Sequence, residues 1–290
     1  MRIWSATLLT ALLAACARVD DAPPVATPSL TLSQRDAPIG SPIDMTYRFA
    51  VAADAPAFAE DYWVFVHFID SNGELMWTDD HQPPTPTREW KPGSTVAYQR
   101  TMFIPKFPYV GEARVELGLF SAASGERLPL AGETDGQRAY RVAAVTMRLQ
   151  TDNLFVIFRD GWHDAEIGGD GTGREWQWSR KEATLAFRNP ERDVRFYLEA
   201  DQPGTAAFSE PQRVELRIGD AVVDAFAVPA DGASVIRRVD IPASRLGAGE
   251  TVEMILSVDK TFVPAEVPLL KSADPRELGL RVFRTFIQPN

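Results

Sequence analysis

Short runs of alternating apolar and polar residues follow one another along the chain from Leu30 onward. Residues 43–49 show the pattern clearly, because every second side chain is apolar. Successive side chains of a β-strand point to opposite faces of a sheet, so a period of two buries one face. Pro, Gly, Asn and Asp interrupt the runs, and no window has the period of a long amphipathic helix. The pattern predicts an all-β fold of the sandwich or barrel type.

The strand-like runs form two series, and 290 residues with 45% apolar side chains provide material for two hydrophobic cores. We therefore expect two tandem β-sandwiches, at residues 30–149 and 150–290. The first series comprises 43–49, 62–69, 74–77, 95–103 and 113–119. The second series is expected to begin near Thr146 and comprises 183–188, 194–200, 213–218, 222–228, 235–241, 252–258 and 280–287.

The N-terminus carries a short apolar segment, residues 3–13, that ends in Leu13-Ala14-Ala15-Cys16. The segment is too short to remain as a membrane-spanning helix but suits a cleaved signal peptide over residues 1–15. The four residues resemble the lipobox of bacterial lipoproteins. That resemblance implies cleavage before Cys16 and acylation of Cys16, including palmitate. Residues 16–29, rich in proline and small side chains, are expected to form a tether.

Acylation would make the lipid bilayer a partner of Cys16, because several acyl chains together give stable attachment. Ala17 follows the cysteine, and in lipoproteins of two-membrane bacteria this usually accompanies transfer to the outer membrane, facing the periplasm. We therefore expect a cell-envelope location. An ordinary secretory signal followed by an unrelated cysteine is the alternative.

The net charge and the cysteine content argue against nucleic acid as a partner and against internal disulfide bonds. The chain has a formal net charge of −10, and removal of residues 1–15 takes away one arginine and no acid, which gives −11. Nucleic acid is therefore not expected as a partner, since its binding needs clustered Lys and Arg. Cys16 is the single cysteine, so no internal disulfide can form and packing must stabilise the fold.

Two groups of motifs resemble recurrent modules of the bacterial envelope. Those of the first half resemble an immunoglobulin-like β-sandwich domain that often lies beside membrane glycosyltransferases: 66–70, 79–81, 86–87, 90–93, 118–120 and 125–128. Those of the second half are similar to a jelly-roll-like domain appended to proteins of surface-polysaccharide metabolism: 161–163, 176–178 and 274–279. The related second module usually carries an aromatic residue where His163 stands. Both resemblances imply architecture, and function only by association.

A glycan site is expected around the glycine-rich loop 168–173. Flat aromatic faces bind sugar rings, and nearby carboxylates accept hydrogen bonds from hydroxyl groups. The candidate ligand-binding residues are Trp162, Trp176, Trp178, Asp164 and Asp170. Trp176 and Trp178 share one face of any strand, so the alternative is that this pair belongs to the core. Asp164, Glu166, Asp170 and Asp201 could also bind calcium, but their spacing fits no calcium loop and solvated acids are the better interpretation.

Other polar groups favour structural roles. His67 with Asp79, Asp80 and His81 could bind zinc or perform acid–base chemistry, yet no metal-binding spacing is present and neither metal nor cofactor is expected. Asp274 and Arg276 are predicted to form a structural bidentate pair. The connection 79–90 contains three prolines, which end any ladder, and long ordered connections often carry function.

Sequence motifs for catalysis are missing: there is no Gly-x-Ser-x-Gly elbow and no cysteine free to act as a nucleophile. We expect a non-enzymatic, lipid-anchored envelope protein that binds glycan or supports surface-polysaccharide handling. One alternative is a structural or protein-binding envelope lipoprotein without a sugar site. Another is a glycoside hydrolase whose carboxylate pair comes from distant strands and leaves no local motif.

Overall fold

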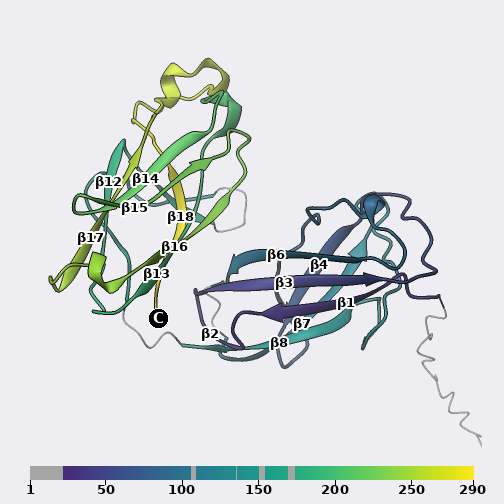
Figure 1. Cartoon of the computed structure of the whole chain (residues 1–290). Helices are drawn as coiled ribbons and strands as arrows, with labels where there is room; N and C mark the ends of the chain where they lie inside the picture. The colour runs from purple at the N-terminus through teal and green to yellow at the C-terminus, as the bar shows by residue number, and fades with distance from the viewer. Residues whose placement is uncertain (1–21, 106–108, 135, 150–153, 169–173) are drawn as a thin grey trace, which may run out of the picture. The chain divides into compact units, whose positions relative to one another are not determined.

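The computed structural model describes residues 22–105, 109–134, 136–149, 154–168 and 174–290 (Figure 1). Strands and short 3-10 turns make up its regular structure, so the predicted all-β class is confirmed. Within these ranges no helix is long and apolar enough to cross a membrane. Cys16, the expected signal peptide and the first part of the expected tether lie outside the described residues.

The described residues divide into two compact units, one within residues 22–32, 45–100 and 112–145 and the other within 33–44, 101–111 and 146–290. Strand pairing separates β1–β8 from β9–β18, because every sheet takes its strands from one of these two sets. We call the two sets the first and the second sandwich. The expected boundary at 149/150 adjoins residues 150–153, which lie outside the described ranges, and stays a prediction.

The first sandwich pairs a three-stranded sheet with a five-stranded sheet. The small sheet has the order β1 (Ala26–Leu32), β3 (Pro42–Val51) and β6 (Thr95–Phe103). The large sheet has the order β2 (Asp36–Pro38), β8 (Tyr140–Arg148), β7 (Gly111–Phe120), β4 (Trp63–Ile69) and β5 (Leu75–Thr78). A 3-10 turn, η1 (Thr87–Glu89), lies in the proline-rich connection. The alternation expected for 43–49 is observed, since Met45, Tyr47 and Phe49 are fully buried.

Two strands of the first sandwich correct the sequence interpretation. Residues 26–29, expected in the tether, instead form the first half of β1, where Pro28 is paired with Phe49 of β3. Proline is tolerated there because β1 is an edge strand. Thr146, expected to open the second series, instead lies in β8 and pairs in parallel with Asp36 of β2.

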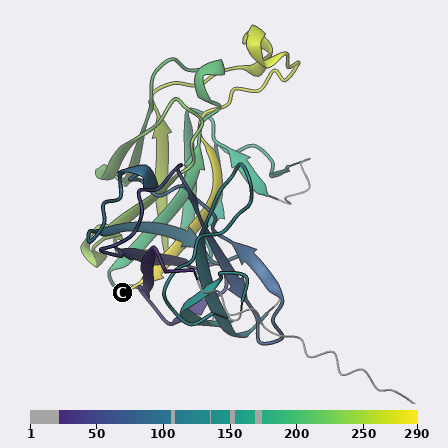
Figure 2. The same ribbon diagram turned by 90° about the vertical axis from the view of Figure 1, so that its right-hand side faces the viewer.

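The second sandwich consists of two five-stranded sheets (Figures 1 and 2). One sheet has the order β10 (Glu166–Ile167), β11 (Glu175–Trp178), β18 (Arg281–Pro289), β13 (Val194–Asp201) and β16 (Val235–Ile241). The other has the order β15 (Ala221–Val228), β14 (Gln212–Ile218), β17 (Thr251–Val258), β12 (Glu182–Arg188) and β9 (Ile157–Phe158). Most of these strands match their predicted ranges to within two residues.

The main core of the second sandwich lies between its two sheets. Alternate residues of β13, from Val194 to Ala200, are fully buried in it, together with Val282 of β18. Since side chains alternate along a strand, Arg281 and Phe283 point to the outer face of their sheet.

A smaller apolar cluster covers one end of that outer face. It joins Trp178 to Phe208, Phe262 and Leu278, and it receives side chains from the segment that carries the 3-10 turns η4 (Pro264–Glu266) and η5 (Pro268–Leu270). A further 3-10 turn, η2 (Gly204–Ala206), precedes Phe208, and η3 (Ala243–Arg245) follows β16. In Figures 1 and 2 the yellow segment with η4 and η5 stands at one end of the second sandwich.

Candidate functional site

The three motif stretches of the second half lie together in the structure. His163 donates its backbone N–H to Trp178 O at 2.9 Å, and its Nε2 lies 2.7 Å from Glu277 O. Gly279 donates its N–H to Ser179 O at 2.7 Å. Arg276 Nη1 lies 2.8 Å from Glu166 Oε1, so stretch 274–279 also contacts β10. Stretches 161–163, 176–178 and 274–279 therefore form one edge of the second sandwich.

The glycines of these motifs are required by close packing of the backbone. A Cβ atom on Gly161, where φ is +80°, would lie 2.1 Å from Glu182 O. A Cβ atom on Gly279 would lie 2.6 Å from Arg180 O. Such approaches are possible only without a side chain, so these glycines specify the fold.

Strand register brings aromatic and charged side chains from several strands onto the outer face of the sheet. Trp178 pairs with Arg281, which pairs in turn with Asp201, and Glu166 pairs with Trp176. We call this surface the aromatic–arginine face. It comprises Glu166, Arg174, Trp176, Trp178, Glu199, Asp201, Asp274, Arg276, Arg281, Phe283 and Arg284.

Guanidinium groups lie over the aromatic rings of this face. The Arg281 guanidinium carbon is 5.3 Å from the Trp176 ring centroid and 5.1 Å from that of Phe283. The Arg174 guanidinium is 3.5 Å from the Phe283 centroid. Trp176 and Phe283 themselves meet edge to face, with centroids 6.4 Å apart. Cation–π and edge-to-face contacts fix these rings in place.

The arginines of the face are held by carboxylates. Arg276 donates from Nε to both oxygens of Asp274 at 3.0 Å and from Nη2 to Oδ2 at 2.7 Å, which confirms the predicted bidentate pair and lowers the pKa of Asp274. Arg281 donates to the two oxygens of Asp201 at 2.7 Å each. These pairs place hydrogen-bonding groups on both sides of Trp176.

Of the predicted site residues, the structure brings Trp176 and Trp178 together and separates Trp162 from them. Trp178 is 7% exposed and belongs to the small apolar cluster. Trp176 is half-buried, and its indole Nε1–H is buried without a hydrogen-bond acceptor in the described part of the chain. Trp162 packs against the main core and donates to Thr184 O at 2.9 Å. Asp164 is exposed to solvent.

Asp170, like Cys16, lies outside the described residues. The sequence interpretation did not include Arg281, Phe283 or Glu199 in the site, although β18 and β13 supply them to the face. The one local signal was the alternation of β18, which puts Arg281 and Phe283 on one side. Their distance from Trp176 in the sequence, more than a hundred residues, concealed the association.

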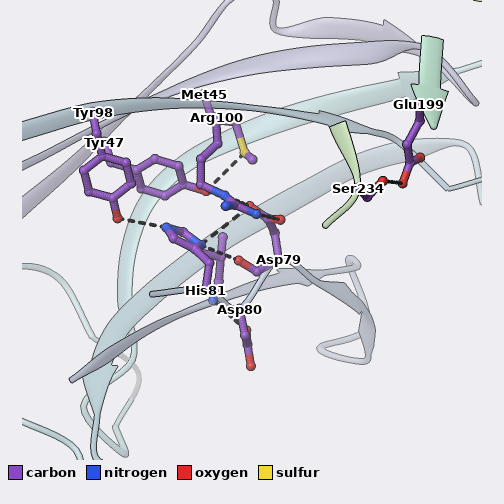
Figure 3. A network of polar contacts seen from close by, with 10 residues as sticks. Met45, Tyr47, Asp79, Asp80, His81, Tyr98, Arg100, Glu199 and Ser234 are labelled. Atoms are coloured by element: carbon purple, nitrogen blue, oxygen red, sulfur yellow. Dashed lines mark hydrogen bonds and ion pairs between the residues drawn. The ribbon is translucent and has the colours of Figure 1, made fainter. Parts of the chain in front are cut away.

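The first sandwich contains a separate polar network around His81 (Figure 3). The ring Nδ1 lies 2.7 Å from Asp79 O and must donate to it, so Nε2 accepts from the Tyr98 hydroxyl at 2.9 Å. Arg100 donates to both oxygens of Asp79 at 2.8 and 3.0 Å. The Tyr47 hydroxyl donates to Asp79 at 3.3 Å.

This network has a structural role, because its members satisfy one another. Burial is the main cause that lowers the pKa of His81, with the Arg100 charge second, so the ring stays neutral. Burial also raises the pKa of Tyr47 and of Tyr98 well above the ordinary value for tyrosine. Among the described residues no group of three or more His, Cys, Asp or Glu is arranged to hold a metal ion.

No known protein-family model matches the chain, and no curated protein matches it. Solved structures that it resembles include the carbohydrate-binding module TmCBM61 in complex with β-1,4-galactotriose. The identity is 8%, the match covers 48% of this chain and 90% of that chain, and the TM-score is 0.26.

Two further matches are the CBM51-2 and INT domains of Clostridium perfringens ZmpB with GlcNAc, and the Pseudomonas fluorescens DNA glycosylase AlkC. The first has 8% identity over 90% of this chain and 41% of that chain, with a TM-score of 0.27. The second has 15% identity over 43% of this chain, which spans 31% of the glycosylase chain, with a TM-score of 0.28. At TM-scores below 0.5 none of these similarities bears on function.

Proposed function

We propose that the chain is a non-enzymatic, lipid-anchored envelope protein that binds glycan through the aromatic–arginine face. The observation that carries the proposal is the position of Trp176. Its half-buried ring lies between the Glu166–Arg276 pair and the Arg281–Asp201 pair. An aromatic plane with fixed donors and acceptors around it matches a sugar ring and its hydroxyl groups.

The charges of the face support binding rather than hydrolysis. A glycoside hydrolase needs two carboxyl groups that face each other across the scissile bond, one of them held protonated. On this face Glu166, Asp201 and Asp274 are each engaged by an arginine. The hydrogen bonds from Arg276 lower the pKa of Asp274, which makes Asp274 a poor proton donor.

The glycan proposal is tested on an array of purified envelope polysaccharides and defined glycans with the mature chain. We expect Trp176→Ala to lose at least about tenfold in affinity. Trp77→Ala, which removes a half-buried tryptophan of the first sandwich, serves as the matched control and should bind like the wild type. Near-ultraviolet circular dichroism verifies that both variants are folded. Unchanged binding by Trp176→Ala, or no binding by the wild type, would refute the proposed site.

The resemblance of residues 13–16 to a lipobox supports the anchor and the envelope location. Metabolic labelling with an alkyne fatty acid should mark the wild type and leave Cys16→Ala unmarked, and fractionation should recover the wild type with membranes. A wild-type chain that carries no label, or that stays in the cytosol at full length, would refute the anchor without affecting the glycan site.

A further inference from the structure

The arginines of the aromatic–arginine face are balanced by acids on the same face. Arg276 holds Asp274 and Glu166, and Arg281 holds Asp201. Arg174 contacts Glu199 at 2.7 Å, and Arg284 lies 3.7 Å from the other oxygen of Glu199. Four arginines and four carboxylates therefore cancel, within a chain whose formal net charge is −10.

This balance disfavours an anionic ligand. A uronate, sulfate or phosphate group on a sugar would meet guanidinium groups whose charge is already balanced by a carboxylate. The ligand charge would lie beside that carboxylate, and the two negative charges would repel each other. An anion is also unable to take the place of Asp201 readily, because Asp201 is 5% exposed and bound by two hydrogen bonds to Arg281. The overall negative charge of the chain adds repulsion at long range.

The same arrangement suits uncharged hydroxyl groups. A carboxylate that accepts from an arginine retains further lone pairs, and a guanidinium has five N–H donors of which one carboxylate takes two. Vicinal hydroxyls can therefore bind without breaking an ion pair.

We infer that the aromatic–arginine face selects uncharged sugars and discriminates against acidic glycans. The inference rests on the proposed glycan site and specifies its ligand class. It follows from the pairing of each of the four arginines of this surface with an acid of the same surface.

The test compares charged and uncharged members of one panel. The panel contains alginate, polygalacturonate and hyaluronan, each in its native form and after chemical reduction of its carboxylates to alcohols, together with mannan, galactan and dextran. We expect binding that depends on Trp176 to be confined to the uncharged polymers. The affinity should change less than about twofold between low salt and roughly 0.5 M NaCl. Trp176-dependent binding to the native acidic forms would overturn the inference and leave the proposed site standing. Binding to no polymer would overturn both.

A charge variant tests the pairing directly. Glu199→Gln removes the acid that balances Arg174 and Arg284. The affinity for the native acidic polymers should therefore rise by about tenfold at low salt and decrease again near 0.5 M NaCl. Glu215→Gln makes the same change in net charge on the other sheet, where Glu215 lies 3.5 Å from Arg217, and should bring no gain. No gain with Glu199→Gln, or an equal gain with both variants, would contradict the inference.

Discussion

Arg281 and Asp201 face each other across β18 and β13, and the guanidinium Nε and Nη2 donate to the two carboxylate oxygens at 2.7 Å each. The Trp178 ring lies 5.4 Å from the same guanidinium. The pair thus connects β18 and β13 to the small apolar cluster that contains Trp178. Loss of one partner leaves the other charge uncompensated in a partly buried position.

Replacement of Asp201 by alanine should lower the free energy of unfolding by about 2–3 kcal/mol, because Arg281 loses its bidentate partner. Arg281→Ala should cost a similar amount, and the double variant should cost less than the sum of the two. Urea denaturation of the four proteins gives the coupling energy. Strictly additive effects would show that the contact contributes nothing as a pair.

Replacement of Gly161 by alanine should destabilise the second sandwich by about 3 kcal/mol or more, since the new Cβ meets Glu182 O at 2.1 Å and φ is +80°. Gly247→Ala is the matched control, because φ is +75° there and a Cβ added to this glycine would have no atom within 4 Å. It should cost only about 1 kcal/mol. Equal losses in urea denaturation would mean that the close approach at Gly161 is unimportant.

The fold could be predicted from the sequence wherever the alternation was clean. Strand 235–241 was expected with its observed bounds, and β3 extends its predicted range by one residue at one end and two at the other. β1 was missed because Pro28 and its small neighbours are typical of a tether, and an edge position, which permits proline, leaves no mark in the sequence. β8 was missed because nothing local distinguishes a last strand of one sandwich from a first strand of the next.

The site could be predicted only in part, because long-range register creates it. The sequence indicated Trp176 and Trp178, which are two residues apart and share a face. It grouped Trp162 with them by proximity, although Trp162 donates to β12 and packs into the main core. The arginines that complete the face come from β18 and from the segments around Arg174 and Arg276, so pairing of distant strands was needed to find them.

The first sandwich should lose stability as the pH falls below about 6.5, the unfolded value for histidine. Burial lowers the folded-state pKa of His81, and also that of His67, so the unfolded chain binds more protons just below this pH. Stability is therefore fully present above the unfolded pKa and declines as the pH falls toward the folded pKa.

His81→Gln should reduce the slope of unfolding free energy against pH between about 7.5 and 5.5, the window that brackets this titration. His67→Gln separates the contribution of the second histidine. Proton NMR of the His81 ring in the wild type should give a midpoint below 6.5, the ordinary pKa of histidine. A midpoint at or above that value, or an unchanged slope in His81→Gln, would refute the prediction.

Trp162 and Trp176 should have opposite phenotypes, because one supports the core and the other lies on the face. Trp162→Ala removes the hydrogen bond to Thr184 O and the edge contact with Phe158 at 4.6 Å, so it should lower stability by about 3 kcal/mol. Where the variant is still folded, glycan affinity should be unchanged. Trp176→Ala removes the edge contact with Phe283 and the contact with the Arg281 guanidinium but no hydrogen bond found in the described chain. It should therefore cost less, about 2 kcal/mol, while binding is lost. Melting curves and binding isotherms measured on both variants separate the two roles, and Trp162→Phe provides a milder replacement. Loss of glycan affinity in folded Trp162→Phe would contradict the assignment of Trp162 to the core.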